Sequence, residues 1–140
     1  MLDESAIGVL EGFLGLKIPG DYRSFLLDGN GQWKGGKDFD VPEQGSTSLN
    51  YFFPLLSKNS TDNLPYKIKL YKGRVPEEML PIGSDSGGNL LLLSLKGKDR
   101  GAIFFWDHEM EAEDEDQQPY YENIKVLSKN FNDFLKLLRD

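Results

Sequence analysis

The residues of this chain best suited to chemistry are a histidine and the acids beside it. His108 is the only histidine, and Asp107 and Glu109 flank it directly. A carboxylate that orients a histidine can make it a general base. Adjacent residues of a strand point to opposite faces, however, so neither acid simply orients the ring. No nucleophilic serine with an oxyanion hole is identifiable. We therefore expect His108 to serve the fold or an interface, and a hydrolase that uses His108 and Asp107 is the catalytic alternative.

A metal site is the second chemical possibility. Its ligands would come from Asp85, Asn89, Asp107, His108 and Glu109. Oxygen-rich sets suit calcium or magnesium, but the loop pattern of a calcium-binding EF-hand is absent. A catalytic zinc site usually needs more than one histidine or cysteine, and the chain has no cysteine. We expect no metal and no other cofactor.

The glycine-rich segment at residues 83–89 invites comparison with a phosphate-binding loop. It lacks the lysine and the Ser/Thr of a Walker loop, and Asp85 would repel a phosphate. A structural turn fits better. We expect positive φ or a close backbone neighbour at Gly87 or Gly88, because the chain must turn sharply there. Asp85 and Asn89 can hydrogen-bond nearby backbone amides.

The two most apolar runs of the chain, residues 90–93 and 102–106, follow this turn. Short apolar runs without alternation are typical of strands buried on both faces. The pattern predicts an antiparallel pair at the centre of a sheet, with residues 83–89 as its entry loop. Trp106 would end the second strand inside the core.

The other elements surround this pair. The sequence predicts a helix over residues 4–14 with an apolar stripe, and a second helix opened by Pro19. Strands are expected over residues 39–41 and 47–55, and a helix over residues 64–71. A last strand would hold Tyr120, Tyr121, Ile124, Val126 and Leu127, and a last helix capped by Asn130 would bury Phe131, Phe134, Leu135 and Leu138. The stripe of the first helix comprises Ala6, Ile7, Leu10, Phe13 and Leu14. This order predicts one α+β domain over residues 1–140, a mainly antiparallel sheet with N-terminal and C-terminal helices packed against it.

Charge and hydropathy narrow the class of partner. The net charge is −7, and residues 107–116 hold seven acids and no lysine or arginine, whereas acids and bases balance elsewhere. Nucleic-acid binding needs a basic face, and none is visible. No apolar run reaches the roughly 18 residues of a membrane span, and the acidic start is unlike a signal peptide. We expect a cytoplasmic protein that contacts neither nucleic acid nor membrane. The acidic segment either attracts a basic partner or is a solvated loop.

Several motifs together resemble those of the SUKH superfamily, which contains yeast cell-wall synthesis regulators and many bacterial immunity proteins. They are LPIGSDSGGN at residues 80–89, WDHE at residues 106–109, and LKIPGDYRSFLL at residues 16–27 followed by Asn30 and Gly31. The resemblance covers essentially the whole chain in the right order. It implies an α+β fold, no catalytic activity and no cofactor. It also implies that the motif residues hold the fold or shape a binding surface; they are Gly83, Asp85, Gly87, Gly88, Asn89, Trp106, Asp107 and His108.

For a bacterial member, the resemblance implies a cytoplasmic antidote that binds and neutralises a toxin, often a nuclease. The alternative is a regulatory scaffold of the same fold that binds a host protein and inhibits nothing. The candidate contact residues are Trp33, Glu109, Glu111, Glu113, Asp114, Glu115, Asp116, Tyr120 and Tyr121. The aromatic residues would be anchors and the acids would attract a basic toxin. For Trp33, a packed loop tip is the alternative to an exposed anchor.

Overall fold

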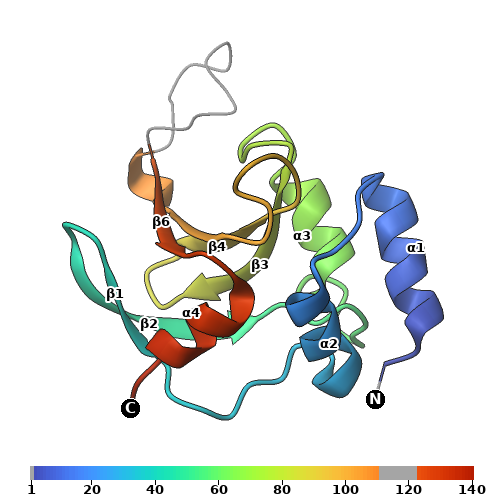
Figure 1. The fold of residues 1–140 in the computed structure, drawn as a ribbon, viewed down its shortest axis with the longest axis horizontal. Coiled ribbons are helices and arrows are strands. Elements are labelled where there is room, and N and C mark those ends of the chain that lie inside the picture. The colour runs from blue at the N-terminus through green and yellow to red at the C-terminus, as the bar shows by residue number, and fades with distance from the viewer. Residues whose placement is uncertain (1, 111–122) are drawn as a thin grey trace.

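The computed structural model describes residues 2–110 and 123–140, and its six strands form one sheet in chain order (Figure 1). The strands are β1 (Asp38–Val41), β2 (Gly45–Phe52), β3 (Met79–Asp85), β4 (Leu90–Ser94), β5 (Ile103–Trp106) and β6 (Ile124–Ser128). The helices are α1 (Glu4–Leu14), α2 (Gly20–Gly29), α3 (Leu64–Leu70), α4 (Phe131–Leu137) and the short 3-10 helix η1 (His108–Met110). Every neighbouring pair of strands is antiparallel. The predicted α+β class is confirmed.

Helices cover both faces of the sheet. On β5, the ring centroid of Phe105 lies 6.5 Å from that of Phe39. The Phe39 centroid in turn lies 5.4 Å from that of Phe134 in α4. The next residue, Trp106, points to the other face and meets Tyr71, just after α3, at 5.7 Å. All five residues of β4 are buried between these layers. The predicted central hairpin with both faces covered is therefore confirmed.

The helix ends follow the expected chemistry. The Asp3 carboxylate accepts a hydrogen bond from the Ser5 amide at 2.9 Å, and α1 ends at Gly15 in the left-handed region. The Asn130 side chain caps α4 by accepting from the Asp133 amide at 2.8 Å. Such caps satisfy amides that have no partner inside the helix. Both starts lie where the sequence predicts them. No helix in the part of the chain described here has the length and apolar character needed to cross a lipid bilayer.

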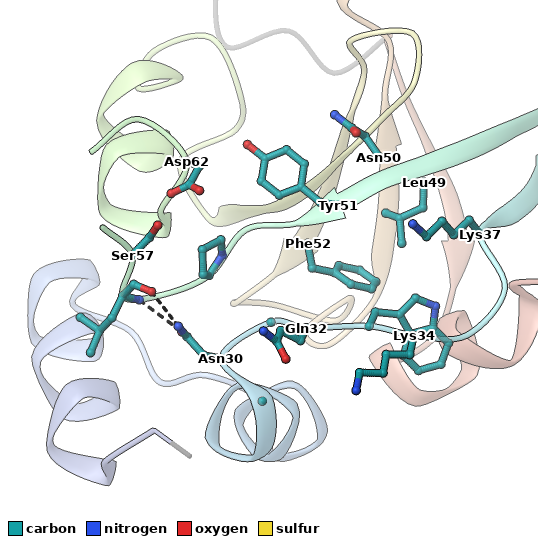
Figure 2. Close-up of a pocket in the computed structure, with 15 residues that line it drawn as sticks. Asn30, Gln32, Lys34, Lys37, Leu49, Asn50, Tyr51, Phe52, Ser57 and Asp62 are labelled. Atoms are coloured by element: carbon teal, nitrogen blue, oxygen red, sulfur yellow. Dashed lines mark hydrogen bonds between the residues drawn. The ribbon is translucent and has the colours of Figure 1, made fainter. Parts of the chain in front are cut away.

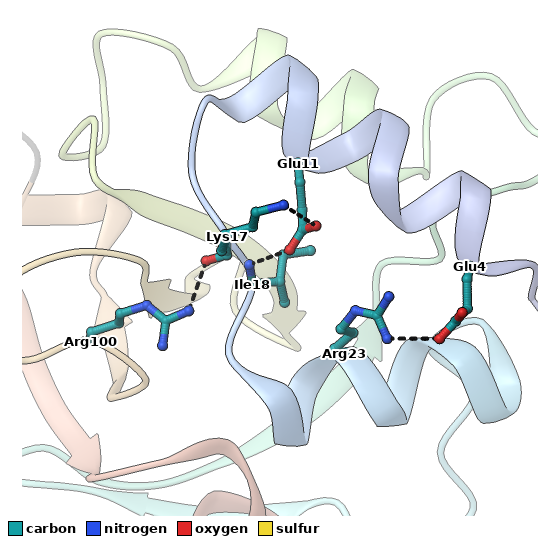
Figure 3. Close-up of polar contacts among 6 residues, drawn as sticks. All are labelled: Glu4, Glu11, Lys17, Ile18, Arg23 and Arg100. Carbon is teal, nitrogen blue, oxygen red and sulfur yellow. Dashed lines mark hydrogen bonds and ion pairs between the residues drawn. The ribbon is translucent and has the colours of Figure 1, made fainter.

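Two polar contacts fasten α1 to the segment that follows it (Figure 3). The Glu4 carboxylate lies 3.2 Å from the Arg23 guanidinium of α2. This pair is largely exposed, so it contributes roughly 0–1 kcal/mol. The Glu11 carboxylate accepts a hydrogen bond from the Ile18 amide at 2.8 Å in a partly buried position. Together these contacts fix how the chain turns from α1 into α2.

Several boundaries and positions differ from the predictions. Residues 83–85 are not part of a loop but the end of β3, where Gly83 pairs with Leu91 and Ser84 with Leu90. Tertiary pairing here overrides the turn signal that a glycine normally gives. The strand β2 runs from residue 45 to 52 rather than from 47 to 55, and Leu138 follows α4 in an extended conformation while still packing on the core. Phe13 of the predicted α1 stripe is 64% exposed.

Candidate functional site

The acidic residue of the glycine-rich turn, Asp85, is buried and holds the turn together. Its Oδ1 accepts hydrogen bonds from the amides of Gly87 at 3.0 Å and Asn89 at 2.7 Å. Its Oδ2 accepts from the Thr47 hydroxyl at 2.8 Å and from Asn89 Nδ2 at 3.1 Å. Both oxygens are thus engaged in charge-assisted bonds. Gly88 has a φ of 85°, which confirms the expected positive φ in this turn.

His108 also stabilises this turn through two hydrogen bonds. Its amide donates to Asn89 Oδ1 at 3.1 Å, and its Nε2 lies 2.9 Å from the Gly87 carbonyl oxygen. A carbonyl only accepts, so Nε2 carries the proton and donates it. Asp107 does not orient this ring, because its Oδ1 accepts from the Glu109 amide at 3.0 Å at the start of η1. We call Asp85, Gly87, Gly88, Asn89 and His108 the turn cluster; its contacts hold backbone in place.

The remaining motif residues also lie at structural positions. Trp106 is fully buried in the core. The Asp107 amide donates to the Asn123 carbonyl at 2.9 Å, and Asn123 Nδ2 donates back to the Asp107 carbonyl at 3.0 Å. A Cβ on Gly83 would lie 3.0 Å from the Tyr51 carbonyl oxygen, so this glycine permits the close approach of β2 and β3. Among the residues with described positions, no three His, Asp or Glu side chains converge as metal ligands.

A groove runs beside β2 (Figure 2). Its volume is about 570 Å³. The β1–β2 ladder begins with the Asp38–Ser48 pair, and the Leu49 amide bonds the Lys37 carbonyl at 2.7 Å. Beyond that point β2 continues to Phe52 while the segment that leads from α2 into β1 bends away. The groove lies between this segment and residues 50–52.

Both ends of the segment opposite β2 are fixed. At the α2 end, Asn30 takes a left-handed conformation, and its Oδ1 accepts from the amides of Leu55 at 2.8 Å and Leu56 at 3.2 Å. At the β1 end, the Lys37 amide donates to the Arg139 carbonyl at 3.0 Å. The groove is therefore held open by hydrogen bonds at each end.

Trp33 lines the groove but is not a free anchor. Its side chain is partly buried and packs against the core. The indole Nε1 donates to the Gly36 carbonyl at 2.8 Å. A Cβ on Gly35 would lie only 2.4 Å from the indole ring, so the ring lies directly over that glycine. Trp33 is packed onto its own loop, which matches the second of the two readings of its sequence context.

The groove has opposite charges at its two ends (Figure 2). Lys34 and Lys37 lie at one end, are exposed, and form no ion pair with any residue that has a described position. Asp62 lies at the other end, near Tyr51. Burial, with smaller effects from Asp62 and Tyr71, raises the pKa of Tyr51. The groove thus presents a basic end and an acidic end.

The sequence did not single out most of these groove residues. Lys34, Lys37, Tyr51 and Asp62 carry no signal of a shared site in the sequence, because only folding brings them to the same groove. Of the other predicted contact residues, Glu109 is exposed on η1. The rest lie outside the described residues; they are Glu111, Glu113, Asp114, Glu115, Asp116, Tyr120 and Tyr121.

Two comparisons place the chain among known proteins. A curated relative, the SPbeta prophage-derived uncharacterized protein YokK of Bacillus subtilis (strain 168), is 29% identical over 149 residues. That match covers 94% of this chain and 71% of the relative. The model of the SMI1 / KNR4 family (SUKH-1) matches residues 1–137. Because this match includes nearly the whole chain, the motifs at both ends of the molecule fall within it, and the chain belongs to the SMI1 / KNR4 family (SUKH-1).

Proposed function

We propose that this chain is a non-catalytic immunity protein, which binds a protein toxin in the bacterial cytoplasm and blocks its activity. One observation carries the proposal: the Asp85 and His108 side chains, which could do acid–base chemistry, are instead engaged in hydrogen bonds that hold the turn. Asp85 accepts four hydrogen bonds, and His108 donates to the Gly87 carbonyl. A reactive group needs an open position beside it for a substrate. The turn cluster is better suited to shaping a surface than to turnover.

Two further observations support a protein partner. The groove beside β2 is open and carries both polar and aromatic groups, which suit recognition of a polypeptide. The relative from Bacillus is prophage-derived by its name. A gene on a mobile element can travel with the gene of the toxin that it counters.

The charge of the chain favours a basic toxin. The net charge is −7, and the excess of acids is concentrated in residues 107–116. Such a concentration attracts a basic surface and accelerates encounter with it. A nuclease has a basic substrate-binding face, because it must bind phosphates. We therefore propose a nuclease-type toxin as the partner class.

Co-expression with a neighbouring toxin gene tests the proposal. A candidate toxin domain chosen from the genomic neighbourhood of this gene is expressed alone and together with this chain, and the purified pair is analysed by size-exclusion chromatography. We expect rescued growth and a stable complex. Growth arrest in spite of folded, co-expressed protein would contradict the proposal. Capture of a host protein without any toxin inhibition would instead support the regulatory scaffold.

The variant His108→Ala separates binding from catalysis. Its fold is first checked by circular dichroism, because His108 braces the turn cluster. We expect the folded variant to protect cells from the toxin as the parent does. A hydrolytic activity of the purified parent that disappears in the folded variant would overturn the non-enzyme assignment.

A further inference from the structure

The edge of β2 beside the groove is an incomplete part of the sheet. On one side, β2 pairs with β3 through Leu49, Tyr51 and Phe52. On the other side, its ladder with β1 ends at Ser48, apart from the Leu49 amide bond to the Lys37 carbonyl. Within the described chain, no strand lies on that side of residues 50–52. Asn50 is exposed at this edge, Tyr51 is partly buried and Phe52 is buried. A strand edge without a neighbouring strand is a template for a further extended segment.

The groove leaves room along this edge. Its lining includes Gln32 and Lys34 from the opposite segment and Asn50, Tyr51 and Phe52 from β2. Phe52 is buried and packs against Phe25, Phe131 and Phe134, so the floor beneath the edge is rigid. Three residues of a strand span roughly 10 Å. The site therefore fits a short extended segment rather than a helix.

The charges of the groove determine what such a segment must carry. Lys34 and Lys37 are exposed and have no acidic partner in the described part of this acidic protein. Asp62, at the far end, disfavours a second negative charge there. An acidic side chain on the segment would therefore be placed at the lysine end. The sheet is antiparallel throughout, and a segment continuing the line of β1 would have its carboxyl end near Lys37.

We infer that the open edge of β2, residues 50–52, is the docking site for an extended segment of the partner protein. The segment pairs antiparallel with β2, and an acidic side chain near its carboxyl end contacts Lys34 and Lys37. This inference rests on the proposed function only for the identity of the partner. The basic surface of the toxin and this acidic segment are separate features: the first attracts the acidic protein, and the second fixes the register of binding.

A peptide titration without toxin tests the inference. The probe is acetyl-Thr-Val-Thr-Asp-amide, added to the ¹⁵N-labelled full chain while backbone amide shifts are followed by NMR. We expect saturable shifts at residues 50–52 and at the Trp33 indole. Two control peptides have a terminal lysine in place of the aspartate, or N-methylated amides that cannot pair with a strand edge. We expect the lysine peptide to bind roughly three- to fivefold more weakly. The N-methylated peptide should cause no saturable shifts.

Two matched double variants test whether Lys34 and Lys37 cause the preference for the aspartate peptide. Lys34→Glu with Lys37→Glu should reverse the preference between the aspartate and lysine peptides. Lys96→Glu with Lys98→Glu makes the same charge change in the exposed turn between β4 and β5 and should leave the preference unchanged. Absence of shifts at residues 50–52 up to the solubility limit would overturn the inference, as would equal binding of the N-methylated peptide or an unchanged preference in the first variant. Because no toxin is present, these results are independent of the co-expression test.

Discussion

At the scale of single residues, the turn cluster shows how reactive side chains can be used for architecture. The Asp85 carboxylate accepts from two backbone amides, one hydroxyl and one side-chain amide. Hydrogen bonds to a charged group contribute about 1.5–3 kcal/mol each. These bonds occupy both carboxylate oxygens, so the Asp85 side chain acts as a structural support for the turn.

The two neighbouring glycines of the cluster make a matched test. Gly88 has a φ of 85°, and a Cβ there would lie 3.4 Å from His108 Nε2. Alanine at this position is strained by its positive φ, although its Cβ would only reach ordinary contact with the imidazole. We expect Gly88→Ala to lower the free energy of unfolding by about 1 kcal/mol or more. Gly87→Ala, whose φ is not positive, should cost less in the same urea titration. Equal effects would mean that the turn relaxes to another geometry.

Tyr22 places its hydroxyl inside the core. Its side chain is fully buried, and its hydroxyl has no partner among the residues with described positions. Removing an unsatisfied buried polar group is neutral or stabilising. We expect Tyr22→Phe to keep or raise the melting temperature at pH 7. A loss of more than about 1 kcal/mol would show that the hydroxyl has a partner.

The same variant gives a defined pH dependence. Burial raises the pKa of the Tyr22 phenol above its ordinary value of 10.0. Below about pH 10 the phenol is neutral in both the folded and the unfolded protein, so the free energy of unfolding has its full value. As the pH rises from there toward the folded pKa, the unfolded phenol ionises while the folded one stays neutral, and the free energy of unfolding falls. At pH 11 the parent should lose up to about 1.4 kcal/mol more than Tyr22→Phe. Urea titrations at pH 7 and pH 11 measure this difference, with the exposed Tyr66→Phe as control.

At the scale of elements, the strongest local signals predicted the structure best. The apolar stripe over residues 4–14 predicted α1, and the cap at Asn130 predicted the start of α4. The apolar runs defined β4 and β5. The end of β3 was missed because Gly83 reads locally as a turn, whereas it is needed for the approach of β2. The groove could not be predicted, since it depends on where the β1–β2 ladder stops, which no local pattern encodes.

The docking of α4 is tested by two substitutions on the same helix. Phe134 is fully buried against Phe39 and Phe52, while Leu137 is 49% exposed. We expect Phe134→Ala to lower the free energy of unfolding by about 3–5 kcal/mol, because it leaves a cavity between helix and sheet. Leu137→Ala should cost much less. Chemical denaturation of both variants measures the contrast; similar midpoints would mean that α4 is not docked through Phe134.

At the scale of the whole molecule, charge and shape have separate roles in the proposed function. The acids of residues 107–116 act over a distance and are screened by salt. The groove beside β2 acts only on contact. It offers a fitting segment Lys34 and Lys37, which have no ion-pair partner among the described residues. Encounter rate should therefore depend on the first feature and residence time on the second. The two are separable in binding kinetics.

Neutralising the acidic segment tests its role in encounter. Glu111, Glu113, Asp114, Glu115 and Asp116 are changed to Gln or Asn, and binding to the cognate toxin is followed by surface-based kinetics at low and moderate salt. Steering can raise association about 10- to 1000-fold, whereas exposed pairs contribute roughly 0–1 kcal/mol each to affinity. We expect slower association with a flatter salt dependence and little change in dissociation. An unchanged association rate with the same salt slope would reduce the segment to a solubilising loop.

The most direct test of the central claim is a titration of toxin activity with this protein. A fixed concentration of purified cognate toxin, well above the dissociation constant of the complex, receives increasing amounts of the chain, and residual activity is measured after equilibration. Binding without catalysis predicts a linear fall to zero at one molecule per toxin, with full activity recovered when the complex is separated under denaturing conditions and the toxin refolded. Inactivation of many toxin molecules by one molecule of this chain, or a toxin left covalently altered, would contradict the account.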